Sequence, residues 1–455
     1  MILPNGSGAP GFVQALQLVA DPIAFLDRNA RRYGDPFNTR VLGWNSPPVV
    51  FFGNPTAIEQ IYTTQADRFE LGKVTHVFRP LTGDRSLIML DGPAHQRQRQ
   101  LLMPPLHGDR MRQYGQLICE ITRQVMADLP LHQFFSIRHY TSEISLQVIL
   151  RVVFGMEPGP RYEQLKALLN TLLESVTSSL YSSQFFFPVL QRNFGRWSPW
   201  GSFLGQMAQI DALILAEIQE RRQTDRSGTD ILSLLLAAQD ENGQGMGDRE
   251  LRDQLMTLLL LGHETTASAL AWAFYWVHAD LGIHDRLLTE LADGAADPDR
   301  LTQLPYLNAV CKESLRVYPI ALISQPRKVK ETVQIDGRQF EPGSILIPCI
   351  YTAHRRAETY PNPERFQPDR FLERKFTPYE FLPFGGGVRS CIGAAFSLYE
   401  MKLVLATVLL SYDLVLDTRG TVQPARRGIT FVPSKQFRLR AIAARKKQGL
   451  IKIGS

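Results

Sequence analysis

A single cysteine in a glycine-rich loop constrains this chain more than any other feature. The segment 384–393 reads Phe-Gly-Gly-Gly-Val-Arg-Ser-Cys-Ile-Gly and lies between an apolar strand-like stretch and a predicted helix. A thiolate needs backbone N–H groups, a nearby cation and a loop whose backbone can approach a bulky partner. The glycines allow that approach, and Arg389 supplies the cation. Cys391 is therefore predicted to be a metal ligand rather than a small buried hydrophobic residue, the alternative for an unpaired cysteine.

Read as Phe-x-x-Gly-x-Arg-x-Cys-x-Gly, this segment resembles the haem-binding loop of the cytochrome P-450 superfamily. The matching positions are Phe384, Gly387, Arg389, Cys391 and Gly393. The resemblance implies that Cys391 is the axial ligand of the iron of haem b and that its thiolate favours O–O cleavage. It further implies that Phe384, Gly387, Arg389 and Gly393 belong to the cofactor-binding loop.

Length and composition allow such a protein. The chain has 455 residues, of which 44% are hydrophobic, enough for a large core. Length alone would suggest about three domains, but no run of Pro, Gly, Ser or like charges separates two halves, and no repeat stands out. We expect one haem-thiolate catalytic domain over residues 1–455, without a fused reductase domain.

Cysteine spacing and charge exclude several classes. The four cysteines, Cys119, Cys311, Cys349 and Cys391, form no CxxC pair, so neither a zinc cluster nor a disulfide framework is indicated. A reducing compartment fits best. The net charge of +6 is modest, and no basic and aromatic array of the nucleic-acid-binding kind is found.

The N-terminal segment contains no targeting signal. The first basic residue is Arg28, so residues 1–20 lack the positive region of a signal peptide and any apolar run of about 18 residues. A cytoplasmic protein without a transmembrane anchor is expected. The apolar stretch 255–277 carries His263 and Glu264 at its centre, where a charge in lipid is costly. It is interpreted as a buried core helix beside a functional site.

That helix contains the sequence Leu261-Gly262-His263-Glu264-Thr265-Thr266. One interpretation is a polar break, because a threonine can bond to the carbonyl four residues earlier and bend a helix. The segment also resembles the oxygen-activation motif of the same family, Ala-Gly-x-Asp/Glu-Thr. The resemblance implies that Thr265 acts in oxygen activation and that Glu264 helps to deliver protons from solvent. Leu261 departs from the family pattern, which has a small residue there, and would narrow the space over the iron.

Glu313 and Arg316 form an i, i+3 acid–base pair on a helix predicted from about residue 307 to 318. Such a pair is usually a solvated surface salt bridge. The segment 361–366, which contains Arg365, resembles the family segment whose arginine joins a Glu-x-x-Arg pair. The resemblance implies that Glu313, Arg316 and Arg365 form a buried charge network with a structural role.

The resemblance also assigns cations to the two haem propionates. His95 and Arg99 lie four residues apart and share one helix face. Arg327 follows Pro326, and Arg389 lies in the cysteine loop. Each alone would be an ordinary surface cation; as a set they resemble the propionate contacts of the family.

The coarse organisation agrees with that family from end to end. Residues 37–52 read as strands around a Pro-Pro turn, and 333–340 reads as a hairpin on Asp336-Gly337. Most of the remaining chain has helical periodicity. The expectation is a mainly α protein with a small β region and the cytochrome P-450 fold, with haem between the Glu264 helix and the helix after Cys391.

The resemblance implies a monooxygenase that uses O₂ and receives electrons from a separate ferredoxin or flavodoxin. A basic patch with Arg97, Arg110 and Arg112 is a candidate docking surface. The expected substrate walls are apolar: 71–89, 181–200, 320–324 and 428–431. The candidate substrate contacts are Leu261, Leu322, Ile323 and Ile429. These walls favour a fatty acid, alkane or terpenoid, and the sequence looks similar to soluble bacterial, particularly cyanobacterial, members.

Two other classes remain open. A peroxygenase or haem-thiolate isomerase would use the same ligand without external electrons, and a haem sensor would keep Cys391 without oxygen activation. Neither class needs the acid–threonine pair Glu264 and Thr265, which counts against both. The substrate, the site of hydroxylation, the redox partner, the oligomeric state and the effect of Leu261 on selectivity cannot be read from the sequence.

Overall fold

The fold is described from a computed structural model of the whole chain. It describes residues 3–42, 46–63, 66–71, 75, 77–178, 181, 184–185, 190–195, 197–224, 228–293, 297–417, 422–428 and 430–445. The chain forms two compact units. Unit 1 comprises Met1–Arg79, Ile88–Gln96 and Leu315–Cys391; unit 2 comprises Pro80–Leu87, Arg97–Ser314 and Ile392–Ser455. The single catalytic domain expected over residues 1–455 stays a prediction.

Unit 1 is built on a five-stranded sheet of order β1-β2-β8-β5-β3. Its strands are β1 (Phe37–Thr39), β2 (Val49–Phe52), β3 (Phe69–Glu70), β5 (Arg327–Val329) and β8 (Ile345–Pro348), beside the hairpin β6 (Val333–Ile335) and β7 (Arg338–Phe340). Its helices are α1 (Gly11–Ala20), α2 (Pro22–Tyr33), α3 (Pro55–Tyr62), η1 (Ala66–Arg68), α17 (Ile350–Ala353), α18 (Arg370–Glu373) and η6 (Gly387–Arg389). The parallel pair β2 and β8 forms the centre of the sheet.

Local sequence explains these elements. All four residues of β2 are buried, as expected for an aromatic and β-branched strand at the centre of a sheet. The β6–β7 turn places Asp336 and Gly337 at φ values of 51° and 70°, which is the conformation that an Asp-Gly hairpin turn needs. Helix α3 begins with Pro55 after Asn54, whose side chain accepts from Thr56 N–H. The predicted strands and the predicted hairpin are confirmed.

Unit 2 is largely helical. Its helices are η3 (Pro104–Leu106), α6 (Asp109–Arg112), α7 (Gly115–Met126), α8 (Ile137–Val148), η4 (Ile149–Val153), α9 (Pro160–Thr177), α11 (Pro199–Thr224), α12 (Ile231–Ala237), α13 (Asp248–Ala279), α14 (Leu281–Asp293), α15 (Pro298–Gln303) and α19 (Ala394–Ser411). Its strands are β4 (Phe134–Phe135), β9 (Tyr412–Leu416), β10 (Pro424–Arg427), β11 (Thr430–Pro433) and β12 (Leu439–Ala444). Helices α4 (Arg79–Thr82), α5 (Gly92–Leu102) and α16 (Pro305–Val317) contribute residues to both units.

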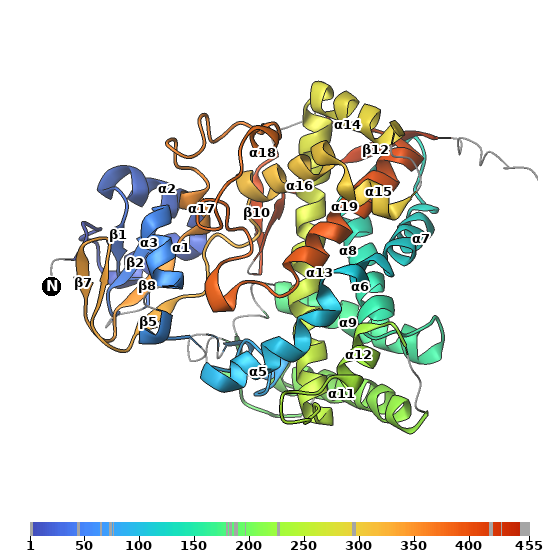
Figure 1. Cartoon of the computed structure of the whole chain (residues 1–455), viewed down its shortest axis with the longest axis horizontal. Helices are drawn as coiled ribbons and strands as arrows, with labels where there is room; N and C mark the ends of the chain where they lie inside the picture. The colour runs from blue at the N-terminus through green and yellow to red at the C-terminus, as the bar shows by residue number, and fades with distance from the viewer. Residues whose placement is uncertain are drawn as a thin grey trace, which may run out of the picture. The chain divides into compact units, whose positions relative to one another are not determined.

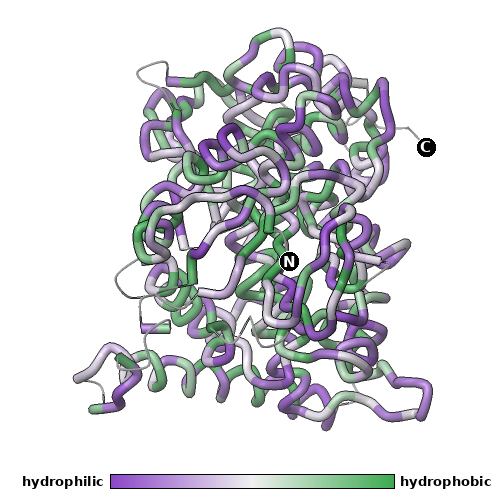
Figure 2. Tube along the Cα trace, turned by 90° about the vertical axis from the view of Figure 1, so that its left-hand side faces the viewer, coloured by the Kyte–Doolittle hydropathy of each residue, from purple (hydrophilic) through white to green (hydrophobic). Residues whose placement is uncertain are grey.

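Helix α13 organises unit 2. It runs through the unit with α8 and α19 packed against it (Figure 1). It also holds the β10–β11 hairpin, because the indole N–H of Trp272 donates to the carbonyl oxygen of Phe431 at 2.9 Å. Figure 2 shows green and purple stretches intermixed along the trace, as expected for amphipathic helices. The expected core helix over 255–277 is therefore confirmed and is longer at its N-terminal end.

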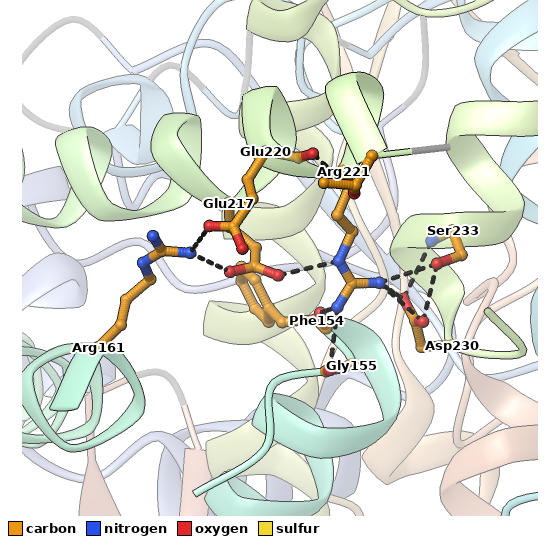
Figure 3. Close-up of polar contacts among 9 residues, drawn as sticks. Phe154, Gly155, Arg161, Glu217, Glu220, Arg221, Asp230 and Ser233 are labelled. Atoms are coloured by element: carbon orange, nitrogen blue, oxygen red, sulfur yellow. Dashed lines mark hydrogen bonds and ion pairs between the residues drawn. The ribbon is translucent and has the colours of Figure 1, made fainter. Parts of the chain in front are cut away.

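A buried charge cluster fixes one end of α11 in the same unit (Figure 3). The Arg221 guanidinium donates to Glu217 at 2.9 Å, to Asp230 at 2.8 Å and to the carbonyl oxygens of Phe154 and Gly155 at 2.8 and 2.9 Å. Only 4% of the Arg221 side chain is exposed. A buried guanidinium needs partners for all its donors, and this arginine finds them on α11, on the residue that caps α12, and after η4. We interpret the cluster as structural.

Among the described residues, the length and composition of one helix, α19, would allow it to cross a membrane. In that window, 61% of the residues are buried inside the protein. The core helix of a protein can be as long, apolar and buried as this. Helix α19 packs against α7 and α13, as a core helix does.

Candidate functional site

The cysteine loop of unit 1 ends with Cys391 at the surface of that unit. The N–H of Cys391 donates to the carbonyl oxygen of Phe384 at 2.9 Å and closes the loop. Gly385 and Gly387 have φ values of 68° and 63°, which favour glycine. Cys391 is exposed, whereas Cys119, Cys311 and Cys349 are buried, and none of the four forms a disulfide. Burial raises the pKa of Cys349 to about 11 and that of Cys311 to about 12. By exposure, Cys391 is the thiol suited to ligation.

Tyr62, the last residue of α3, lies against this loop. A β-carbon on Gly386 would lie 2.5 Å from two carbons of the Tyr62 ring, and one on Gly387 would lie 2.6 Å from its carbonyl oxygen. The ring also lies 5.4 Å from the guanidinium carbon of Arg327. The glycines are thus needed for close approach to α3, which sequence reasoning assigned only to a bulky ligand. Three adjacent glycines signalled a close contact, but nothing local identified Tyr62 as the partner.

Two of the predicted propionate cations are buried in unit 1. Arg389 donates to the carbonyl oxygen of Leu90 and pairs with Asp91. Arg327 is 4% exposed, donates to the carbonyl oxygen of Gln325 at 2.6 Å, and has no carboxylate within ion-pair distance among the residues that the structure describes. Burial lowers the pKa of Arg327 to about 10.

This arrangement provides a test of fit for an anionic cofactor. A buried guanidinium without a carboxylate is costly unless a ligand supplies the negative charge. Arg327 therefore fits a propionate of haem, and an exposed thiol closing a glycine loop fits an iron ligand. On α5, His95 is buried and Arg99, four residues later, is half-buried. Gly393 lies at the start of α19, where its carbonyl oxygen accepts from Ser397 N–H at 2.8 Å.

The second group of predicted residues lies on α13 in unit 2. The Thr265 hydroxyl donates to the carbonyl oxygen of Leu261 at 2.6 Å, as expected for a threonine that bonds to the preceding turn. Leu261 and Thr265 are half-buried. A β-carbon on Gly262 would meet only a methyl carbon of Ile149 at 3.5 Å, an ordinary contact. Packing within the protein therefore does not require glycine at this position, and the residue leaves room beside the helix.

Glu264 is buried and held by two arginines. Its Oε1 lies 2.5 Å from an Nη of Arg138, at the start of α8, and 3.3 Å from Nε of Arg427, at the end of β10. The Ser268 hydroxyl donates to the backbone carbonyl oxygen of Glu264 at 2.6 Å. Sequence reasoning identified Glu264 but missed both arginines, because they lie far along the chain and no local pattern marks them.

Neighbouring residues of α13 connect it to α8 and α19. His263 Nε2 lies 3.1 Å from the Ser142 hydroxyl, and the Thr266 hydroxyl lies 3.1 Å from that of Ser397. Burial lowers the pKa of His263, so the imidazole is neutral at physiological pH. Glu264 is therefore the acidic group of this segment, and its charge is balanced by Arg138 and Arg427.

The predicted charge network is only partly correct. Glu313 and Arg316 both lie on α16 and are fully buried. The Arg316 guanidinium donates to the carbonyl oxygens of His354 at 2.9 Å and Pro363 at 2.8 Å. It reaches Arg365 through the backbone carbonyl oxygen, at 3.0 Å, while Arg365 itself is exposed. The expectation that the Arg365 charge belongs to a buried network is corrected, because a second cation would have to be desolvated next to Arg316.

The candidate substrate contacts are found in different settings. Leu322 is buried, and its carbonyl oxygen accepts from Tyr351 N–H at 2.9 Å. Ile323, the next residue, is 37% exposed. Leu261 lies on α13, one turn before Thr265, and Ile429 lies outside the residues that the structure describes.

The structure thus assembles the predicted residues in two groups. In unit 1, Cys391 closes a loop that lies on Tyr62, which also contacts Arg327. In unit 2, α13 carries Leu261, Thr265 and the paired Glu264. The first group provides a thiol and buried cations for a metal-containing anionic cofactor. The second provides a hydroxyl and a carboxylate that can hold or pass protons.

The comparisons with known proteins all point to one family. The family model described as Cytochrome P450 matches residues 4–440. A Mycobacterium tuberculosis protein named as cytochrome P450 135B1 is 35% identical over 453 residues, which covers 98% of this chain and 92% of that protein. A second from that organism, named as cytochrome P450 138, is 32% identical over 435 residues, which covers 95% of this chain and 94% of that protein.

Solved structures show the same fold. The retinoic acid-bound cyanobacterial CYP120A1 superposes with a TM-score of 0.83 at 25% identity, covering 97% of this chain and 99% of that one. The haem domain of cytochrome P450DA superposes with a TM-score of 0.82 at 21% identity, covering 98% of each chain, and shows likeness of fold alone. These matches confirm the predicted fold class, mainly α with small sheets.

Proposed function

Because the chain belongs to the cytochrome P450 family, which makes it a haem b-dependent monooxygenase, we propose that Cys391 is the axial ligand of the haem iron. The single observation that carries this proposal is the setting of the thiol. Cys391 is the exposed cysteine of the chain, and it closes a glycine loop against Phe384. Bound haem supplies the binding and activation of O₂, and the protein must hold the cofactor and manage protons.

The haem propionates are proposed to pair with cations of the predicted set. Arg327 is the best supported, because its buried guanidinium has no carboxylate partner among the described residues. Arg389 already pairs with Asp91, so it would share its charge between that residue and a propionate. His95 and Arg99 lie four residues apart on one face of α5, and we assign them the same role of pairing with a propionate.

Proton supply is assigned to Glu264 and Thr265. The hydrogen of the Thr265 hydroxyl is directed at the Leu261 carbonyl oxygen, which leaves the hydroxyl oxygen able to accept a further hydrogen bond. The residue before Thr265 is Glu264, whose carboxylate lies between Arg138 and Arg427. These arginines keep the carboxylate in place, so a proton delivered to Glu264 must compete with both ion pairs.

We propose a lipophilic substrate: a fatty acid, an alkane or a terpenoid. One oxygen atom enters a C–H bond and the other leaves as water, with uptake of two electrons and two protons. Leu261 supports an apolar surface near Thr265, since it lies one turn earlier on α13. The retinoic acid carried by the cyanobacterial structure is itself an isoprenoid acid, which supports the lipophilic class.

Electrons are proposed to come from a separate ferredoxin or flavodoxin. Of the three arginines expected to form the docking patch, Arg97 is engaged inside unit 2, where it pairs with Asp240 at 2.5 Å and Glu250 at 3.5 Å. Arg110 and Arg112 are exposed, and Arg112 lies 3.5 Å from Asp109. Arg110 and Arg112 therefore remain as the candidate patch. If charge reversal of both leaves the salt dependence of reduction unchanged, this docking surface is wrong.

A cytoplasmic location is proposed on chemical grounds. All four cysteines are free of disulfides, which suits a reducing compartment. The apolar helix α19 is better explained by core packing than by a membrane, because most of it is buried.

The test compares Cys391→Ser with Cys119→Ser. Cys119 is buried, and its sulfur accepts from the Thr407 hydroxyl at 3.4 Å, so a serine oxygen can take its place. Cys391→Ser should abolish the thiolate-type spectrum of the reduced carbon monoxide complex, and Cys119→Ser should retain it. Retention of that spectrum in Cys391→Ser would refute the assignment.

Product formation then separates the alternative classes. A reductase system, peroxide and neither are supplied in turn to the wild type with the same lipophilic substrate. Product only with the reductase supports the monooxygenase. Product with peroxide alone indicates a peroxygenase, isomerised product with neither indicates an isomerase, and no product under any condition favours a haem sensor.

A further inference from the structure

A buried histidine of unit 1 is bonded to the segment that leads into the cysteine loop. His354 directly follows α17 and is 0% exposed. Its Nε2 accepts from the backbone N–H of Leu382 at 3.0 Å, across 28 positions of the chain. Its ring also stacks on that of Phe381, with centroids 5.5 Å apart and planes at 19°. The imidazole therefore holds two consecutive residues of this segment, one through its backbone and one through its side chain.

The direction of this hydrogen bond fixes the tautomer of His354. Because Nε2 accepts, the hydrogen of the neutral ring is on Nδ1. Burial, together with the nearby charge of Arg316, lowers the pKa of His354 to about 3, so the ring is neutral at physiological pH. Nδ1 is buried and has no hydrogen-bond partner among the residues that the structure describes.

The unpartnered Nδ1–H group shows that packing alone does not favour histidine at position 354. A buried donor without a partner costs free energy, and an apolar ring such as that of phenylalanine would avoid that cost. What phenylalanine lacks is the acceptor for Leu382 N–H. Local costs of this kind are typical of functional sites. Here the cost accompanies a bond to the segment that enters the cysteine loop.

Tyr360 holds the same segment two residues earlier. Its side chain is 0% exposed, and its hydroxyl donates to the carbonyl oxygen of Glu380 at 3.0 Å. The Tyr360 ring meets that of His354 edge to face, with 6.2 Å between the centroids. His354 and Tyr360 thus form one aromatic pair, which bonds the backbone of Glu380 and that of Leu382.

Both members of this aromatic pair contact Arg316. The Arg316 guanidinium donates to the carbonyl oxygen of His354 at 2.9 Å. Its central carbon lies 4.9 Å from the centre of the Tyr360 ring, within the range of a cation–π contact. Arg316 is itself 0% exposed, so these contacts are shielded from water. The arginine therefore fixes the backbone of one aromatic residue and the ring of the other.

Beyond Leu382, hydrogen bonds continue into the cysteine loop. The carbonyl oxygen of Leu382 accepts from Gly385 N–H at 3.0 Å, and that of Phe384 accepts from Cys391 N–H at 2.9 Å. Leu382 is 1% exposed. A shift of Leu382 would therefore move the turn at Gly385 and, through Phe384, the backbone of Cys391. All of these residues belong to unit 1.

We propose that His354 and Tyr360 are positioning residues that set where the Cys391 thiolate lies, because they connect Arg316 to the segment that enters the cysteine loop. They act through the backbone of Glu380 and Leu382. Loss of the acceptor on His354 would leave haem able to bind, but the sulfur would leave the iron more readily. The inference rests on the proposed function, because it assumes that Cys391 is the axial ligand.

The experiment compares His354→Phe with His354→Gln in the haem-loaded full chain. Phenylalanine keeps a ring beside Phe381 but has no acceptor, whereas a glutamine side-chain oxygen can accept from Leu382 N–H. His278→Phe is the matched control. His278 is also a buried histidine, and its Nδ1 lies 2.7 Å from the carbonyl oxygen of Phe274 within α13.

Two measurements are made on each protein. The first is amide hydrogen exchange at Leu382 and Gly385. The second is the rate at which the reduced carbon monoxide complex loses its thiolate-type spectrum at a fixed temperature, with haem content measured in parallel. Haem content separates loss of the cofactor from loss of the sulfur ligand.

His354→Phe should raise amide exchange at Leu382 by about tenfold or more, because the acceptor is lost. It should also speed the loss of the thiolate-type spectrum by about tenfold at unchanged haem content. His354→Gln should recover most of both effects, and His278→Phe should change neither by more than about twofold. Raised exchange with an unchanged rate of spectral loss would overturn the proposal, as would unchanged exchange. Equal spectral loss in His354→Phe and His278→Phe would also overturn it, because general destabilisation would then be the cause.

Tyr360→Phe provides a milder variant should His354→Phe fail to fold. It removes only the hydroxyl that donates to Glu380 and keeps the ring over Arg316. It should speed the spectral loss by about threefold, and an unchanged rate would overturn the role of the aromatic pair.

A wild-type protein that never shows the thiolate-type spectrum would contradict Cys391 as the ligand instead. Exchange at Leu382 still reports whether His354 holds the segment in that case, so the two failures are distinguishable.

Discussion

The ring of Tyr62 occupies the space that a β-carbon on Gly386 would need, with two ring carbons 2.5 Å from the ideal position. The relationship joins the end of α3 to the cysteine loop, which lies more than three hundred residues later in the chain. Packing inside the protein, without any ligand, therefore requires glycine at position 386. It also explains why the loop and Arg327 share one neighbour, since the same ring lies under the guanidinium.

Gly386→Ala should therefore destabilise the loop by about 1–3 kcal/mol, the usual cost of an added methyl group in a filled space. We expect less haem bound per chain. Tyr62→Ala in the same chain should restore part of the loss, because it removes the obstacle. Gly8→Ala is the control, since a β-carbon there meets nothing within 4 Å. Haem content by absorbance measures the effect, and absence of rescue in the double variant would contradict the steric cause.

Arg327→Met should have opposite effects on the apoprotein and on cofactor binding. The buried guanidinium costs folding free energy, because its pKa is lowered to about 10 from 12.5. Replacing it should stabilise the apoprotein by on the order of 2 kcal/mol and weaken haem retention by about tenfold or more. Lys328→Met is the control, since Lys328 is the next residue of β5 and is 46% exposed at its side chain. Equal haem release from both variants would refute the assignment of Arg327 to a propionate.

Glu264→Gln should leave Arg138 and Arg427 with unbalanced charges. Their side chains are 19% and 34% exposed, so solvent reduces the cost, and we expect a loss of roughly 1–2 kcal/mol in unfolding free energy. Product formed per electron consumed should fall by about tenfold or more if Glu264 supplies protons. Arg138→Gln is the comparison, because it should cost similar stability while Glu264, still paired with Arg427, keeps most of the product yield. Equal yields in wild type and Glu264→Gln would show that the carboxylate has only a structural role.

Glu400 should make stability fall as pH rises. This residue of α19 is buried, with Ser145 of α8 beside it, and burial raises its pKa to about 8 from 4.5. Below about pH 4.5 both states are protonated; between there and pH 8 only the unfolded chain loses the proton, so the free energy of unfolding decreases by up to roughly 5 kcal/mol. Denaturant unfolding at several pH values should show a shallower decrease for Glu400→Gln than for the wild type. Parallel pH profiles would mean that the carboxyl is ionised in the folded protein.

Arg221 and Arg222 offer a test of buried against exposed charge. Arg221→Ala should cost about 3–5 kcal/mol, because Glu217 and Asp230 would remain buried without their cation. Arg222 is 40% exposed and pairs with Asp248 at 2.8 Å, so Arg222→Ala should cost about 0–1 kcal/mol. Thermal unfolding of the two variants measures both values. Similar losses would show that the cluster around Arg221 is not the structural anchor described above.

The sequence by itself determined the elements whose cause is local. The Asp336-Gly337 pair specifies its hairpin because few other residues adopt its positive φ values, and the apolar stretch 255–277 specifies a buried helix by composition. The cysteine loop is also local, since spacing alone identifies Cys391 and Arg389 as residues of one short segment.

Only the tertiary structure decided which distant groups meet these segments. Arg138 pairs with Glu264 across 126 positions, and Gln254 reaches Arg85 across 169. Arg365 also shows that a motif does not determine which group of a residue makes the contact. Its motif suggested a buried charge, whereas the side chain is exposed and the backbone carbonyl oxygen accepts from Arg316. Side-chain pairing depends on how helices and loops pack, and packing energy is summed over contacts that no local pattern records. The candidate residues of the site could therefore be found from the sequence, while their electrostatic partners follow from the fold.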